Sequence, residues 1–211
     1  QAGLTLDTIT RNVLQSGTNV YYCPKAAANG QTTPVTDRSG LDKTCVLTVD
    51  VVKKVAAMLK AANAPRIAGD YVCILHPYVA YDIMSDPHWE DMHKYCNPEN
   101  MYEGEIGRIA GVRFVETSEA AVYKGTENDC PQGLAVFGCL FLADGAYGVT
   151  EVSGGGLTTI IKQLGSAGTA DPLDQRSTVG WKALQTAEIL MEPYMVRVEC
   201  CSAFSPTAEA N

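Results

Sequence analysis

The chain has 211 residues, of which 46% are hydrophobic and 19% charged, and this composition is typical of a folded globular protein rather than a disordered one. Its formal net charge of −8, from 24 acidic and 16 basic residues, argues against a protein that grips nucleic acid through a dense basic surface. No apolar run reaches the length of about 18 residues that a transmembrane helix needs, so no membrane partner is expected.

Two amphipathic helices are predicted in the first third of the chain. Residues 4–16 place apolar side chains on one face, and Gly17 suits the helix end. Residues 24–44 are polar and rich in turn formers, which indicates a loop or an irregular hairpin. A second apolar stripe predicts a helix over 49–62 that ends before Pro65.

The rest of the chain is predicted to be mostly strands. A buried strand over 71–75 precedes a helical turn over 78–84 and a short helix over 88–96. Helices therefore come first and strands mostly later, which predicts an α+β fold. The later strands are expected at about 109–116, 120–124, 134–143, 146–152, 157–163 and 177–203, the last one broken near Pro193.

The eight cysteines are predicted to be reduced structural thiols. No CxxC pair is present, which argues against a zinc ribbon or a thioredoxin-type motif. Cys73 and Cys139 lie in apolar strand patterns, where a thiol packs as a small hydrophobe. We therefore expect no disulfide.

A small metal- or thiol-dependent enzyme built on His76, His88, His93 and Cys96 is the alternative from another class of protein. His93 and Cys96 are spaced to share a helix face, but they have no second ligand pair at a set spacing. The three glycines at 154–156 are followed by a β-like run rather than by a Lys-Ser/Thr pair, and no GxSxG motif occurs. The prediction is therefore no catalytic residue, no cofactor and no metal.

Two long segments carry a family resemblance. They are GEIGRIAGVRFVET at 104–117 and GSAGTADPLDQRSTVGWKA at 165–183, and AGLTLDTITRNVLQSGTNV at 2–20 extends the likeness to the start of the chain. With these segments the chain resembles the major capsid protein of tailed phages, most closely the N-four-type subfamily. The resemblance implies the α+β Hong Kong 97-like capsid fold.

The resemblance also implies a division of the chain. Residues 1–47 would hold the end of the long spine helix and a peripheral-domain segment, 48–165 the axial domain, and 166–211 the returning peripheral strands. Because the sequence starts at Gln1, we expect a fold truncated at the N-terminus, without the N-terminal arm and the extended loop.

The implied function is structural rather than enzymatic. Copies of the chain would assemble in the host cytoplasm into pentamers and hexamers of an icosahedral virion head that encloses double-stranded DNA without sequence-specific binding. Portal, scaffold or decoration proteins are the further partners. An encapsulin-like nanocompartment shell is the alternative within the same fold.

One stretch combines features of a subunit contact. It places two acids and two bases near a stiffening proline and next to a large aromatic anchor. We therefore expect this stretch to lie at a contact between subunits, through Asp171, Asp174, Arg176, Trp181 and Lys182.

Overall fold

A seven-stranded mixed sheet forms the centre of the body. The structure is a computed structural model that describes residues 2–27, 31–90, 106–150, 156–166, 173 and 175–211. The strand order is β1-β13-β8-β4-β6-β5, with β7 paired to the first residues of β8. The strands are β1 (Val20–Tyr22), β4 (Tyr71–Leu75), β5 (Arg108–Ile109), β6 (Val112–Glu116), β7 (Val122–Tyr123), β8 (Val136–Leu142) and β13 (Met195–Cys200).

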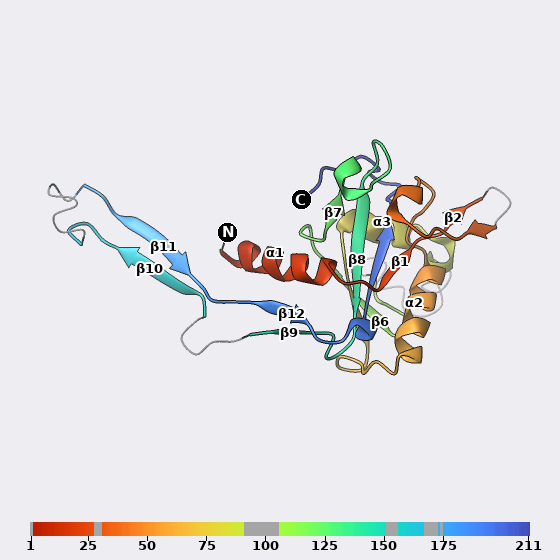
Figure 1. Cartoon of the computed structure of the whole chain (residues 1–211), viewed down its shortest axis with the longest axis horizontal. Coiled ribbons are helices and arrows are strands. Elements are labelled where there is room, and N and C mark those ends of the chain that lie inside the picture. Colours follow the sequence, from red (N-terminus) through yellow and green to blue (C-terminus); the bar gives the residue numbers. More distant parts are fainter. Residues whose placement is uncertain (1, 28–30, 91–105, 151–155, 167–172, 174) are drawn as a thin grey trace.

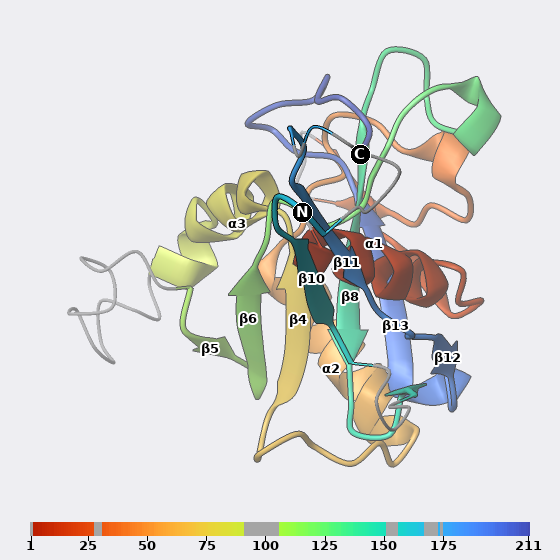
Figure 2. The same cartoon turned by 90° about the vertical axis from the view of Figure 1, so that its left-hand side faces the viewer.

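Both faces of this sheet are covered by packed side chains at its centre, and its central strand β8 is apolar throughout. Every residue of β8 is buried, so this strand lacks the alternation of a half-exposed strand. Phe137 and Phe141 point into the larger core, where α2 (Val49–Ala61) and α3 (Pro77–Met84) pack. Leu140 and Leu142 point the other way and meet Leu14 of α1 (Ala2–Gln15). Figures 1 and 2 show α1 and α2 on opposite sides of the sheet.

The two long predicted helices are confirmed. α1 and α2 match the expected 4–16 and 49–62 closely, and α3 replaces the helical turn expected over 78–84. Residues 87–90 are helical, as the start of the helix predicted over 88–96 requires, and the rest of that helix lies outside the described residues. Asp86 links the start of α2 to the start of the helix at residues 87–90. Its carboxylate accepts hydrogen bonds from the Val49 and His88 N–H groups at 2.9 Å each.

The single strand predicted over 109–116 is wrong, because the chain turns back within it. β5 and β6 form a hairpin in which Ile109 pairs with Val112. Ala110 and Gly111 make the turn with φ of 55° and 82°, the left-handed pair that a tight hairpin requires. The other strands expected before residue 163 are present as β7, β8, β9 (Tyr147–Val149) and β10 (Thr158–Lys162).

The strand predicted over 177–203 is divided into separate parts. β11 (Thr178–Lys182) and β12 (Ala187–Ile189) are followed by a 3-10 turn over Glu192–Tyr194, and only then by β13. The break falls at Pro193, as expected, because proline has no N–H for a ladder hydrogen bond.

The central sheet draws strands from all three predicted chain segments. β1, which sequence patterns missed, pairs in parallel with β13, and β13 pairs with β8. The segments 1–47, 48–165 and 166–211 thus meet in one sheet. The expected irregular hairpin over 24–44 is confirmed by β2 (Lys25–Ala26) and β3 (Thr32–Thr33). Among the described residues no helix has the length and apolarity to cross a bilayer.

Candidate subunit-contact surface

A β-arm extends from the body (Figure 1). We use this name for the residues of 147–189 that the structure describes. At its base β9 pairs with β12, and further out β10 and β11 form a five-residue antiparallel ladder. All ten residues of the β10–β11 ladder are exposed. An isolated two-stranded hairpin is at best marginally stable in water, so this ladder is expected to gain stability from a surface outside its own chain.

The two faces of the ladder differ in character. Thr159 pairs with Trp181 and Ile161 with Val179, and paired residues of a ladder share a face. Ile161 is 64% exposed, Val179 75% and Trp181 44%. We call these four residues the apolar face. The opposite face carries Lys182 and Lys162 with Ile160 between them.

Exposed hydrophobic side chains concentrate on the arm. Ten of the eighteen large hydrophobic residues that are exposed in the described part of the chain lie on the arm, between Tyr147 and Leu184. Scattered exposed hydrophobics are ordinary, but a concentration of this kind marks an interaction surface. The arm is therefore the strongest candidate for contact with another protein surface.

The structure tests the position of only part of the predicted contact set. Trp181 and Lys182 lie on β11 and point to opposite faces of the ladder, so only Trp181 belongs to the apolar face. Arg176 is exposed just before β11. Asp171 and Asp174 lie outside the described residues. The five residues remain a predicted contact surface, and the β10 side of the apolar face was missed because its residues carry no charge.

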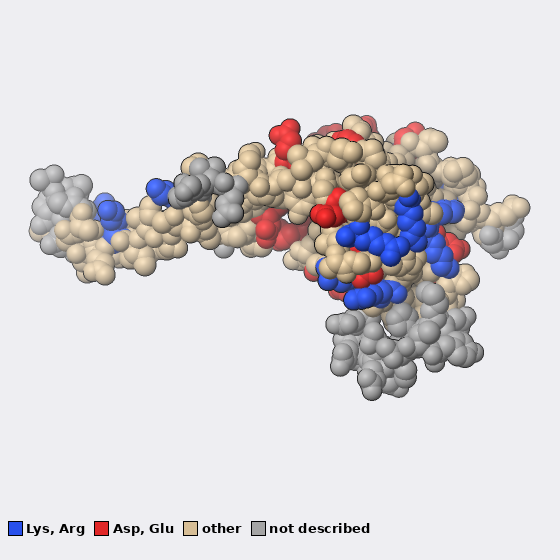
Figure 3. Space-filling model, turned by 90° about the horizontal axis from the view of Figure 1, so that it is seen from below, with Lys and Arg blue, Asp and Glu red and all other residues tan. Residues whose placement is uncertain are grey.

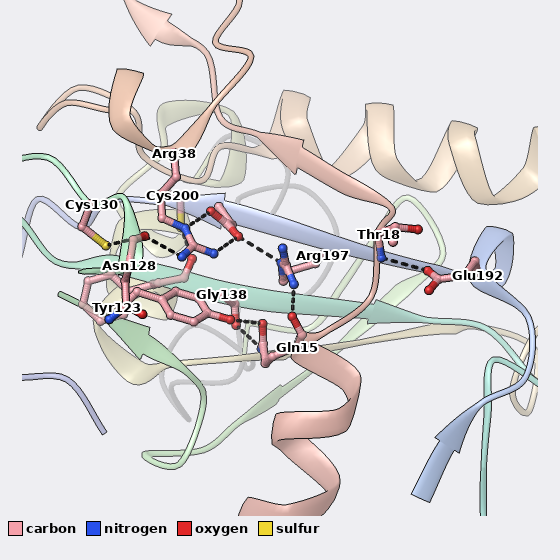
Figure 4. A network of polar contacts seen from close by, with 12 residues as sticks. Gln15, Thr18, Arg38, Tyr123, Asn128, Cys130, Gly138, Glu192, Arg197 and Cys200 are labelled. Carbon is pink, nitrogen blue, oxygen red and sulfur yellow. Dashed lines mark hydrogen bonds and ion pairs between the residues drawn. The ribbon is translucent and has the colours of Figure 1, made fainter. Parts of the chain in front are cut away.

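A buried ionic cluster joins α1 to the body (Figure 4). Glu199 of β13 is fully buried and binds Arg38 through two hydrogen bonds of 2.6 Å. Arg197 Nε lies 3.0 Å from Glu199 Oε1, an ion-pair distance, although its N–H makes no hydrogen bond. Arg197 also donates to the backbone carbonyl of Gln15, the last residue of α1. We call Arg38, Arg197 and Glu199 the ionic junction.

Further contacts fix the orientation of the junction. The Arg38 guanidinium lies 4.0 Å from the centre of the Tyr123 ring and donates to the Asn128 carbonyl at 2.8 Å. The Tyr123 hydroxyl in turn donates to the Gln15 side chain at 2.7 Å. The hydrogen bonds to Glu199 raise the pKa of Arg38, so the guanidinium stays charged. Alternation along β13 puts Arg197 and Glu199 on the same strand face, whereas nothing in the sequence pointed to Arg38.

The residues of the alternative enzyme do not form a site in the described part of the chain. His76 caps α3 by accepting from the Tyr78 N–H at 3.2 Å, and its ring packs 5.2 Å from that of Phe137. Burial lowers the pKa of His76, which favours the neutral ring that this cap requires. His93 and Cys96 lie outside the described residues, and no group of three potential ligands is present among the others.

The seven described cysteines are buried free thiols. Burial raises the pKa of Cys73 well above its usual value and that of Cys201 to about 12. The thiolate is the reactive form, so these groups are poor nucleophiles at neutral pH.

One family model and several solved structures match the chain. Residues 5–139 match the model of a family described as phage capsid protein. The capsid of Helicobacter pylori bacteriophage KHP30 is similar with a TM-score of 0.61 and 10% identity, over 94% of this chain and 66% of that one. The capsid of cyanophage Pam1 gives a TM-score of 0.64 and 11% identity, over 88% and 54%.

The encapsulin of Synechococcus elongatus PCC 7942 is also similar, with a TM-score of 0.54 and 8% identity over 100% of this chain and 65% of that one. No curated protein matches the chain in sequence. This chain spans less than two thirds of the length of these three shell proteins. The fold is the Hong Kong 97-like capsid fold, as the resemblance implied, and the chain belongs to the phage capsid protein family.

Proposed function

We propose that this chain is the major capsid protein of a tailed phage and that copies of it assemble into the icosahedral head around double-stranded DNA. The observation that carries this proposal is the exposed β-arm in a chain of the phage capsid family. A structural protein of this kind acts by shape, because symmetry repeats several modest interfaces many times.

In this proposal the body takes the axial position around the five- and six-fold axes, and α1 with the β-arm takes the peripheral position. The ionic junction links the two parts, because it holds the end of α1 against the central sheet. Gln185 of the arm also donates to Thr10 of α1 at 2.8 Å. The arm and α1 are therefore expected to move as one unit relative to neighbouring subunits.

The apolar face supplies the contact in this scheme. Ile161, Val179 and Trp181 would be covered by a neighbouring subunit, with Arg176 paired to a carboxylate at the edge of the same interface. Portal, scaffold or decoration proteins are further proposed partners, and assembly is proposed to occur in the host cytoplasm before the chain becomes part of the virion.

Purified particles test the proposal. Electron microscopy is expected to find closed shells that contain pentamers and hexamers, and nuclease-protected DNA is expected inside them. Shells that enclose a protein cargo and no DNA would instead support the nanocompartment alternative, which the similarity to the encapsulin favours. A stable monomer as the sole native species would contradict both shell functions.

A further inference from the structure

The side-chain cover on one face of the central sheet ends before the β6 edge. The register pairs Ile74 of β4 with Leu140 of β8 and with Val115 of β6, so these three side chains lie on the face that α1 covers. Leu14 of α1 packs on Leu140, Ile74 lies at the edge of that cluster, and Val115 beyond it is 43% exposed. A parallel strand pair such as β4–β6 is ordinarily covered on both faces, so this part of the sheet is expected to be covered by a further surface.

The same face carries two arginines. Arg113 alternates with Val115 along β6 and pairs with Arg108 across the β5–β6 hairpin, and like charges opposite each other destabilise such a pair. The Asp70 carboxylate lies 3.3 Å from Arg108 Nε, whereas Arg113 is exposed and has no ion pair among the described residues. A carboxylate on a covering surface would reduce this repulsion. We call the set the sheet strip: Ile74, Arg108, Arg113 and Val115.

An apolar surface with carboxylates lies where the β-arm meets the body. Glu188 of β12 is exposed, and two residues later Leu190 is 60% exposed. The Leu190 and Met191 N–H groups both donate to the Ala146 carbonyl, at 2.9 and 3.2 Å, which holds them beside the turn that exposes Asp144. Neither Glu188 nor Asp144 has an ion pair within the described ranges. We call the set the acidic corner: Asp144, Glu188, Leu190 and Met191.

The sheet strip and the acidic corner lie at opposite edges of the molecule. β6 is near one end of the strand order β1-β13-β8-β4-β6-β5, and β12 leads into β13 near the other end. Figure 2 shows β6 and β12 on opposite sides of β8. Figure 3, seen from below, shows acidic side chains where the arm meets the body and Lys and Arg side chains farther over the body. Two different surfaces at opposite edges of a chain can join copies head to tail, and such a contact can close into a ring.

We propose that the sheet strip of one copy binds the acidic corner of a second copy and that this contact joins neighbouring subunits within a ring. The inference rests on the proposed function, because a shell places identical subunits side by side in closed rings. In this contact Arg113 pairs with Glu188 of the neighbouring copy. Val115 packs beside that pair against Leu190 of the same neighbour, which gives the apolar centre and charged rim of an ordinary protein interface.

Charge complementarity selects the acidic corner as the surface that covers the strip. The apolar face of the β-arm is also exposed, but its ladder carries Lys162 and Lys182 and no acid. An arm laid on the strip would bring these lysines toward Arg108 and Arg113, and like charges across an interface disfavour a partner. The acidic corner instead brings two carboxylates that have no ion pair within the described chain.

Charge reversal tests the contact in the full chain. Arg113→Glu and Glu188→Arg are each expected to raise the critical concentration of assembly, measured by light scattering, by at least about 10-fold, because close charge pairs between proteins are worth that much or more. The combined variant Arg113→Glu/Glu188→Arg again places opposite charges across the contact. It is therefore expected to assemble near the parental concentration.

The matched controls are Lys54→Glu and Glu127→Arg, which make the same charge changes on exposed side chains outside both surfaces. Both controls are expected to assemble as the parent does. An equal loss in the controls, or no recovery in the combined variant, would overturn the inference. All four side chains are exposed, so thermal unfolding of the dispersed subunits is expected to stay at the parental temperature.

Arg113→Lys provides a second measurement that requires no loss of assembly. Carbodiimide treatment of assemblies mixed from isotope-labelled and unlabelled copies is expected to link position 113 to Glu188 of another copy, as mass spectrometry of the cross-linked peptides would show. Absence of this link would overturn the inference. Rings that show the link and the charge-reversal recovery but never close into shells would support the inference while the proposed function fails. Shells that form at the parental concentration despite either single reversal would overturn the inference and leave the proposed function standing.

Discussion

Replacing Ile161 and Val179 together by threonine is expected to block assembly while leaving the isolated subunit folded. Both residues are exposed in the single chain, at 64% and 75%, and threonine keeps the β-branched shape that suits a strand. The free energy of unfolding of the subunit is therefore expected to change by less than about 0.5 kcal/mol.

The expected effect on assembly follows from the same exposed fractions. If a neighbour covers the apolar face, each substitution replaces an apolar group by a hydroxyl in a buried contact. Loss of the apolar transfer term and desolvation of the hydroxyl together weaken the contact by about 1–2 kcal/mol per site. Two sites give about 2–4 kcal/mol, which raises the critical concentration of assembly roughly 30- to 700-fold.

Light scattering of a concentration series and thermal unfolding of the dispersed subunit are the two assays. Ile160→Thr is the matched control, because Ile160 lies on the same strand but on the opposite face of the ladder. Unchanged assembly of the double variant would refute the assignment of the apolar face. An equal loss with Ile160→Thr would show that the hairpin as a whole, rather than this face, is sensitive.

Three further predictions concern single residues. Arg176→Ala is expected to lower particle yield or particle melting temperature. If the carboxylate partner of Arg176 is buried between subunits, the substitution weakens that contact by about 2–5 kcal/mol. Unchanged yield and melting temperature would show that the loop only connects strands. Glu199→Gln leaves the partly buried Arg38 and Arg197 without their carboxylate, so calorimetry of the subunit is expected to show a loss of about 3–5 kcal/mol, and a loss below 1 kcal/mol would contradict the account of the junction. Because the pKa of His76 is lowered by burial, its contribution to stability is present above about pH 6.5 and is lost as the pH falls below that value. His76→Asn keeps a capping oxygen, so denaturant titrations at pH 7.5 and 5.5 are expected to show near-parental stability with a smaller loss on acidification, and an unaltered pH dependence would show that other groups are responsible.

Elements with a strong local signal could be predicted from the sequence. The apolar stripe of α2 and the apolar run at β8 fix their structure type locally, and both are found at the expected positions. The strand over 109–116 failed because Ala110, an ordinary strand residue in a pattern, adopts φ of 55° in a hairpin turn. The direction of the chain there is set by pairing with β4 rather than by local preference.

The sites show the same division between local and long-range information. Trp181 was found because a large aromatic side chain in a polar loop stands out, but its partners on β10 depend on the ladder register. The ionic junction joins Arg38 to Glu199 across 161 positions of sequence, and charge spacing alone gives no signal for such a contact.

Cryo-electron microscopy of native particles that contain this chain tests the central claim most directly. The account predicts closed shells with five- and six-subunit rings, in which the apolar face of each β-arm contacts a neighbouring subunit and DNA fills the interior. Particles with the arm exposed to solvent would contradict the contact assignment. A chain found natively as a stable monomer, with no shell, would contradict the account as a whole.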